Sequence, residues 1–340
     1  MSHPGILALC PGPCYSPGMN SADLSALWSS LLHPLGRLLL AMCVGLLVAN
    51  VVEALRWTQP LARLSAPLVR MARLGEAAGA SFSLAFFSPS AANALLAESH
   101  ARGETSGREL VFANLFNSLP SYMVHLPTML FLLWPVLGPP ALVYTGLTLV
   151  AAILRTLITA LLGHWLLPPL TGEHCVPCRL PGNRVSFRGA LHSAWLRFRR
   201  RVPRLFLFTI PIYALMFLLQ KYGIFQHVQD WLGAGAPWMG PIKPEALGIV
   251  LLSLAAEIGA SLSAAGSALH MGGLTTADVI LALLIGNILS TPMRTIRHQF
   301  PAYAGYYSPG LALRLILINQ SLRAASMIGV TWLYWRCAIA

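Results

Sequence analysis

The stretch PALVYTGLTLVAAILRTLITALLGHWLL, residues 140–167, contains 28 residues and one formally charged side chain, that of Arg155. An α-helix rises about 1.5 Å per residue, so this run is long enough to cross the roughly 30 Å hydrocarbon core of a bilayer. An apolar run of about 18 or more residues with few charges is the usual mark of a membrane span. The stretch therefore predicts a transmembrane helix.

The whole chain has the composition of an integral membrane protein. Of its 340 residues, 56% are hydrophobic and 10% are charged, and the mean hydropathy is +0.65. A soluble domain usually carries about 25% charged residues. The composition therefore excludes a disordered protein, a disulfide-rich secreted scaffold and a conventional cytosolic enzyme. The net charge of +12 fits the enrichment of Lys and Arg in cytoplasmic loops, and we expect no nucleic-acid partner.

Five other apolar runs are long enough to span a bilayer, namely 31–53, 109–134, 203–222, 275–296 and 309–335. Two further stretches, 77–98 and 246–270, are apolar but interrupted by small and polar residues. These two fit either full spans or re-entrant hairpins.

The sequence also repeats itself at a shift of 170 residues, which aligns Ser83-Leu84-Ala85 with Ser253-Leu254-Ala255 and Asn117 with Asn287. In each copy a hydroxyl residue precedes an acid by three positions, at Ser106 and Thr275, and this spacing is typical of a helix start. The shared register predicts an internal duplication.

The distribution of Lys and Arg indicates how the two halves are oriented. If both interrupted stretches are hairpins, 16 of these residues lie in cytoplasmic segments and 3 in outer ones, whereas full spans give 11 and 8. We therefore predict an all-α membrane protein of about six transmembrane helices and two re-entrant helical hairpins in two inverted repeats. Both termini are expected outside the cell (inner) membrane and the loop 168–204 inside.

This topology divides the chain into an irregular leader (1–28), a first repeat (29–170), a basic cytoplasmic linker (171–202) and a second repeat (203–340). Whether Cys10 and Cys14 of the leader form a disulfide stays open. From Arg184 to Arg204, arginines alternate with aromatic residues, which predicts an amphipathic helix on anionic lipids.

Several short motifs resemble the nucleoside-recognition or gate domain of spore-maturation-like membrane proteins, of ferrous-iron transporter membrane domains and, distantly, of concentrative nucleoside transporters. They are Pro67-Leu68-Val69-Arg70, Ser88-Pro89-Ser90-Ala91-Ala92-Asn93, Gly103-x-Thr105, Asn117-Ser118-Leu119-Pro120, Lys243-Pro244-Glu245-Ala246-Leu247 and Asn287-x-x-Ser290-Thr291-Pro292. The resemblance covers about 61–165 and 240–330. It implies paired helical hairpins and broken helices around a central site.

Polar residues at the repeated breaks are the candidate substrate-binding set: Ser88, Ser90, Asn93, Asn117, Ser118, Ser261, Ser263, Asn287 and Ser290. Non-helical backbone at membrane depth is tolerated where it lines a polar cavity. For any single Ser, close helix packing is the favoured explanation, and only the set as a whole indicates a polar cavity. For each Asn, an interhelical hydrogen bond is an equally good explanation. We expect Asn117 and Asn287 to line one site.

Three ionisable residues fall inside apolar segments. Arg155 and Arg323 lie near the middle of the last span of each half, where an Arg costs about 2.5–3.5 kcal/mol. Their partners are either carbonyls of broken helices, Glu257, or an anionic group of the solute. Glu257 is the candidate for carrying a proton or a coupling ion, and its alternative role is a salt bridge to an Arg.

His174, Cys175 and Cys178 are weak candidates for a metal site, because three ligands do not complete a closed structural zinc site. We expect no cofactor and no metal.

These features favour a secondary transporter that moves a small polar solute by alternating access through a midplane site between inverted repeats. An anionic solute and a homo-oligomer both stay open. The alternative is a non-transporting membrane assembly or signalling factor, and the remote alternative is an intramembrane hydrolase. The sequence places no Ser/His/Asp set at membrane depth and contains no His-Glu-x-x-His, so we do not predict an enzyme.

Overall fold

The structure is a computed structural model that describes residues 28–55, 66–169, 186–222, 243–255, 258–270 and 272–339. Within these ranges all regular structure is helical, which confirms the all-α part of the prediction. Four helical segments are long and apolar enough to cross a membrane: His33–Val52, Gly107–Leu137, Pro140–Leu166 and Pro309–Ala338. They match four of the six predicted spans.

In the described residues of the first half, the structure has a π-helical turn and seven helices. In chain order they are η1 (Trp28–Leu32), α2 (His33–Ala54), α4 (Ala66–Met71), α5 (Glu76–Ala85), α6 (Pro89–Ala101), α7 (Gly107–Phe116), α8 (Ser118–Leu137) and α9 (Pro140–Leu166).

The second half follows a related order. Its elements are α10 (Phe187–Lys221), the 3-10 turn η3 (Pro244–Ala246), α12 (Leu247–Ala255), α13 (Ile258–His270), α14 (Thr276–Leu289), α15 (Thr291–Arg294), the π-helical turn η4 (Thr295–Gln299), α16 (Phe300–Ala304) and α17 (Pro309–Ala338).

Each interrupted apolar stretch folds as two short helices that pack against each other, α5 with α6 and α12 with α13. The break before α6 has a local cause, because Ser88 is extended and its Oγ accepts a hydrogen bond from Ala91 N at 3.2 Å while Pro89 opens the helix. Helices of 9 to 13 residues measure about 14–20 Å, which is less than the hydrocarbon thickness. No one of them is long enough to cross a bilayer alone.

Two expected spans differ in the structure. The apolar run 203–222 continues the basic stretch without a break, because α10 runs through Pro203 as one helix of 35 residues. The predicted boundary between the linker (171–202) and the second repeat (203–340) therefore falls within a helix. The run 275–296 is interrupted after Leu289, where the hydroxyls of Ser290 and Thr291 bond back to the carbonyl of Asn287. Such bonds compete with the helical ladder.

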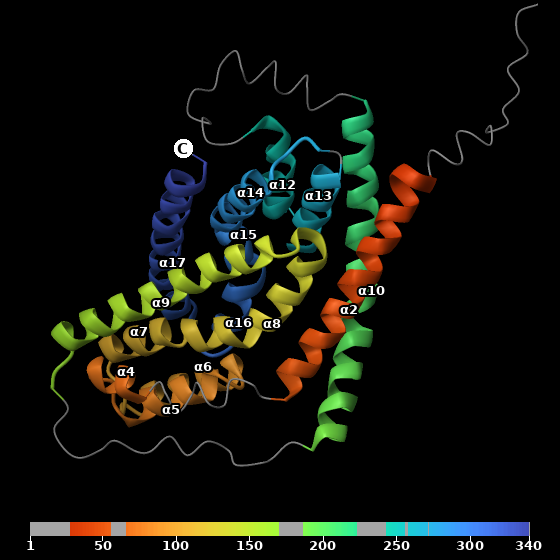
Figure 1. Ribbon diagram of the computed structural model, residues 1–340. Helices are drawn as coiled ribbons and strands as arrows, with labels where there is room; N and C mark the ends of the chain where they lie inside the picture. The colour runs from red at the N-terminus through yellow and green to blue at the C-terminus, as the bar shows by residue number, and fades with distance from the viewer. Residues whose placement is uncertain are drawn as a thin grey trace, which may run out of the picture.

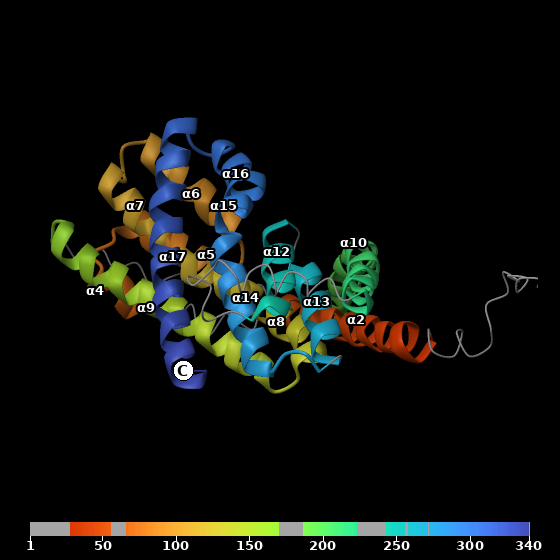
Figure 2. The same cartoon turned by 90° about the horizontal axis from the view of Figure 1, so that it is seen from above.

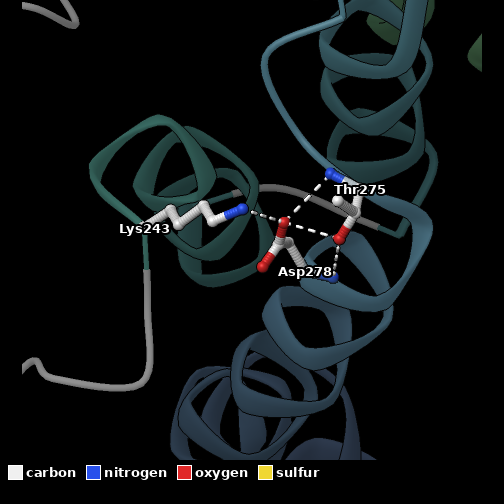
Figure 3. Close-up of polar contacts among 3 residues, drawn as sticks. All are labelled: Lys243, Thr275 and Asp278. Atoms are coloured by element: carbon white, nitrogen blue, oxygen red, sulfur yellow. Dashed lines mark hydrogen bonds and ion pairs between the residues drawn. The ribbon is translucent and has the colours of Figure 1, made fainter. Parts of the chain in front are cut away.

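The two predicted helix starts are confirmed. Ser106 Oγ accepts a hydrogen bond from Glu109 N at 3.2 Å, and Thr275 and Asp278 form a complete capping box. Each acid also reaches the residues before its helical hairpin. Glu109 Oε1 accepts a hydrogen bond from Gly75 N at 2.8 Å. Asp278 Oδ2 accepts one from Lys243 Nζ at 2.6 Å, and Figure 3 shows this second contact. In both halves, the acid that caps the helix after the hairpin (α7 or α14) thus also holds the start of that hairpin.

In space, α2 and α10 lie side by side at one edge of the molecule, and α17 crosses α9 (Figures 1 and 2). Buried apolar side chains form two main clusters. One is built mainly on α2, α8, α12, α13 and α14, and the other on the α5–α6 hairpin and α7. Helices α9 and α17 contribute to both clusters, so they join the two cores.

Helix α9 has the polarity expected of a lipid-facing span. Its inward face carries small and hydroxyl residues, whereas its outward face exposes large apolar ones, including Leu142, Val150, Leu157 and Leu161. Contiguous exposed apolar surface of this kind is unfavourable in water and suits a membrane. The protein is therefore a helical membrane protein.

Candidate functional site

The two intramembrane arginines lie where the two apolar cores meet. On α9, Arg155 stands between Ala151 of one core and Ala160 of the other, and only 5% of it is exposed. On α17, Arg323 stands between Leu315 and Met327 in the same way and is partly buried. The crossing of α9 and α17 brings these two helix centres together.

Asn287, near the end of α14, is the centre of the site. Its side-chain oxygen Oδ1 accepts hydrogen bonds from Arg294 Nη2 and from Arg323 Nη2, each at 2.9 Å. Because both nitrogens lie 2.9 Å from the same oxygen, they can be no more than twice that distance apart. Two guanidinium groups therefore share one neutral amide oxygen.

The remaining polar atoms of Asn287 are also occupied. Its Nδ2 donates to the hydroxyl of Tyr144 at 3.0 Å, and its carbonyl accepts from Arg294 Nη2 at 2.7 Å. The hydroxyls of Ser290 and Thr291 donate to the same carbonyl at 3.1 Å. The carbonyl of Asn287 thus holds the break after α14, while its side chain links that break to α9 and α17.

Arg155 approaches the site from the other half. Its Nε donates to Ser118 Oγ at 3.1 Å, and Ser118 is the first residue of α8 after the break at Asn117. The charge of Arg323 interacts electrostatically with those of both Arg155 and Arg294. We call Arg155, Arg294 and Arg323 the arginine cluster.

The arginine cluster has no carboxylate partner among the residues whose positions are described. The acids found in those ranges pair elsewhere or lie apart from it: Glu98 and Glu104 contact Arg102, and Asp278 contacts Lys243. Two unit charges about 6 Å apart repel by about 3 kcal/mol at an effective dielectric constant near 20. Within the described part of the chain, the positive charge of the cluster is therefore not balanced by an acid.

A second polar group, the amide cluster, is formed by Asn93, Asn114, Asn319 and Tyr303. Asn114 Nδ2 donates to Asn93 Oδ1 at 3.3 Å and to Tyr303 OH at 3.0 Å, and Asn319 Nδ2 donates to Asn114 Oδ1 at 3.3 Å. Burial raises the pKa of the Tyr303 hydroxyl, although its hydrogen bonds with Asn114 and Asn93 oppose the shift. The hydroxyl is neutral at physiological pH.

The amide cluster lies about one helical turn from the arginine cluster. Asn319 precedes Arg323 by four residues on α17, and Asn114 precedes Ser118 by four residues across the α7–α8 break. The two clusters thus form one polar strip along α17, from α6 and α16 to the middle of the molecule.

The structure brings together five of the predicted site residues and separates others. Those in or against the arginine cluster are Ser118, Arg155, Asn287, Ser290 and Arg323. Asn117 donates instead to Ser81 Oγ at 2.7 Å, while Asn93 belongs to the amide cluster. Ser88 caps α6, Ser90 is exposed, and Ser261 and Ser263 are buried on α13. Glu257, His174, Cys175 and Cys178 lie outside the described residues.

Sequence reasoning did not find Arg294, Tyr144 or the amide partners Asn114, Asn319 and Tyr303. Arg294 lies near the end of the apolar run 275–296, where a basic residue is expected at the cytoplasmic boundary. A signal was available in its spacing, since it lies seven residues, about two turns, after Asn287. In the described part of the chain, no group of three or more His, Cys, Asp or Glu side chains could hold a metal ion.

Comparison with known proteins identifies similar sequences, but none of them has a stated activity. Three proteins of Methanocaldococcus jannaschii are similar over most of their length, and their names state only that they are uncharacterized. MJ0871 is 23% identical over 90% of this chain and 93% of its own, and MJ1556 is 23% identical over 83% and 88%. MJ0880 is 20% identical over 86% and 94%.

No protein-family model matches the sequence, and no solved structure matches it either.

Proposed function

We propose that this protein is a secondary transporter that moves a small polar solute, one that carries a negative group, by alternating access. The observation that carries the proposal is the arginine cluster, which places three cations, none of them paired with an acid among the described residues, at the centre of a membrane protein. Ionisable groups at membrane depth are costly and usually mark a substrate or ion pathway. The chemistry of the site is that of binding, since its side chains donate hydrogen bonds and carry positive charge.

The proposal includes two inverted repeats of three spans and one re-entrant hairpin each. Three features support it: both hairpins consist of helices shorter than the bilayer, both are followed by a capped helix, and both of these helices are interrupted. Interrupted helices at matching places in two halves are typical of transporters with a midplane site. The resemblance to gate-domain proteins implies the same arrangement.

The polar strip supplies a route to such a site. It begins at the amide cluster, where Tyr303 and Asn93 meet, and continues along α17 to Arg323. Buried amides and hydroxyls replace the hydration of a polar solute, which apolar walls would not do. Movement of the two cores relative to each other about α9 and α17 would then expose the site to either side of the membrane.

Uptake into proteoliposomes tests this function. Purified protein is reconstituted into neutral-lipid vesicles, which are loaded with one unlabelled solute from panels of oxyanions, nucleosides and divalent metals, and exchange of labelled solute is followed. We expect saturable exchange for an anionic solute and none for metals. The matched control is Arg314→Gln, which removes an exposed Arg from the same helix as Arg323 and should leave exchange unchanged.

Lack of exchange across every panel by folded, monodisperse protein would reject the transporter. The non-transporting assembly or signalling factor would then be the better explanation.

The orientation in the membrane is tested separately by cysteine labelling. Right-side-out cells that express single-Cys variants are treated, after reduction, with an impermeant maleimide. Because the Lys and Arg distribution puts both termini outside, we expect Cys10 to be labelled and Cys175 to be protected until the cells are permeabilised. The reverse pattern would invert the proposed topology.

A further inference from the structure

We propose that Arg155, Arg294 and Arg323 bind a phosphate-like oxyanion, a tetrahedral group with about two negative charges such as phosphate, phosphonate or sulfate. This inference names the substrate class of the transport site and, as far as transport is concerned, rests on the proposed function. The binding itself stands on the geometry of the arginine cluster.

The first step is the environment of Asn287 Oδ1. Two guanidinium N–H groups point at this oxygen from 2.9 Å, one from Arg294 on α15 and one from Arg323 on α17. This arrangement is the one that arginines adopt around an anionic oxygen. The neutral amide oxygen thus holds two cationic donors at one point without neutralising their charge, which stays available to an anion bound beside it.

The second step is charge. No acid within the described ranges pairs with the cluster, while the acids of α6 and α14 have other partners. A singly charged ligand would leave two positive charges unbalanced at membrane depth. A dianion leaves one and offers several oxygens to the three guanidinium groups, whose planar forks match such oxygens. Charge and geometry together thus favour a divalent oxyanion over chloride.

The third step is the set of donors that the protein leaves unused. Arg155 and Arg323 each make one hydrogen bond in the described structure, and both bonds go to side-chain oxygens of the site. Arg294 also binds the carbonyl of Asn287, so part of its role is to hold the helix break. Its Nε is nevertheless buried and has no hydrogen-bond partner in the described structure. A buried donor without a partner is unfavourable, and an oxygen of the ligand would accept a hydrogen bond from this Nε.

The phosphate group could come from a free solute or from a lipid headgroup, and the test separates the two. The protein is purified in neutral detergent, and its thermal unfolding is followed while inorganic phosphate, sulfate or, in a separate arm, short-chain phosphatidic acid is added. Chloride at equal ionic strength is the reference. We expect phosphate and sulfate to raise the unfolding temperature in a saturable manner, because a ligand that binds the native state stabilises it.

The variants then locate the site. Arg294→Gln and Arg323→Gln are each expected to weaken phosphate binding at least tenfold, whereas Arg314→Gln should leave it unchanged. Equal phosphate binding by both cluster variants would overturn the proposal. The proposal would also be overturned if phosphate, sulfate and phosphatidic acid all failed to stabilise the unmodified protein more than chloride does. This titration uses the unmodified protein, so it gives a decision even if a variant does not fold.

The arms also separate this inference from the proposed function. Binding of free phosphate without exchange in vesicles would support the oxyanion site and reject the transporter. Exchange of a neutral solute by a protein that does not bind oxyanions would keep transport by alternating access but reject both the oxyanion site and the negative charge of the solute. Binding of phosphatidic acid alone would support the site but assign it to a lipid headgroup.

Discussion

Replacement of Asn287 by Asp is expected to stabilise the protein and to abolish its binding of phosphate. The substitution changes an amide into a carboxylate of almost the same shape, at the oxygen that Arg294 and Arg323 already contact at 2.9 Å. Hydrogen bonds that involve charged groups contribute about 1.5–3 kcal/mol, more than neutral ones. The hydroxyl of Tyr144 can donate to the new carboxylate, so no partner is lost. We expect the free energy of unfolding to rise by about 1–3 kcal/mol, measured by thermal unfolding in detergent.

The attached carboxylate also neutralises part of the positive charge of the arginine cluster that the ligand would otherwise balance. Phosphate should therefore no longer raise the unfolding temperature of Asn287→Asp, and its uptake into vesicles should fall to background.

Asn117→Asp is the matched control for that change. Asn117 is 5% exposed, and its Nδ2 contacts Ser81 Oγ rather than an Arg. The same chemical change there buries a carboxylate without a cation, which is costly, so this variant should be destabilised. If both variants lose stability alike, the arginine cluster does not present an excess of positive charge to Asn287.

Replacement of Arg155 or Arg323 by Lys is expected to reduce kcat/KM for uptake at least tenfold. This reduction corresponds to a loss of about 1.4 kcal/mol of transition-state stabilisation. Lys keeps the charge but lacks the planar fork that binds two oxygens at once. Arg155 also needs its Nε for Ser118, which lies beside the break of the first half. Uptake of labelled phosphate is measured in vesicles with equal amounts of folded protein.

Arg314→Lys is the control, since that side chain is exposed on α17, away from the cluster. Normal uptake by both Lys variants of the cluster would show that the charge alone suffices and that no fork geometry is used. A loss of folded yield that accompanies every loss of uptake would assign these arginines a structural role.

Local sequence was sufficient for much of the fold. The long apolar runs predict α2, the α7–α8 segment, α9 and α17, because a helix that crosses a membrane needs about 20 apolar residues in succession. The hydroxyl-to-acid spacing at Ser106 and Thr275 predicts the starts of α7 and α14, since a cap is made by neighbours in the chain. Ser88-Pro89 predicts the break before α6 for the same reason.

Apolar runs were less informative where the helix depends on contacts beyond the run. The interruption after Leu289 results from hydroxyls and an arginine that bond to the carbonyl of Asn287. Likewise, the continuity of α10 through Pro203 was not apparent from the change from a basic to an apolar composition.

By itself, the sequence determined that this is a helical membrane protein, that its apolar stretches break at polar residues, and that Arg155 and Arg323 lie in the middle of their helices. Only the tertiary structure decided which polar residues meet. The crossing of α9 and α17 brings Arg155 of one half near Arg323 of the other, and the end of α14 adds Arg294 through Asn287. The reason is physical: caps and spans depend on residues within a few positions, whereas a shared charge cluster depends on helices that are distant in the chain and pack together.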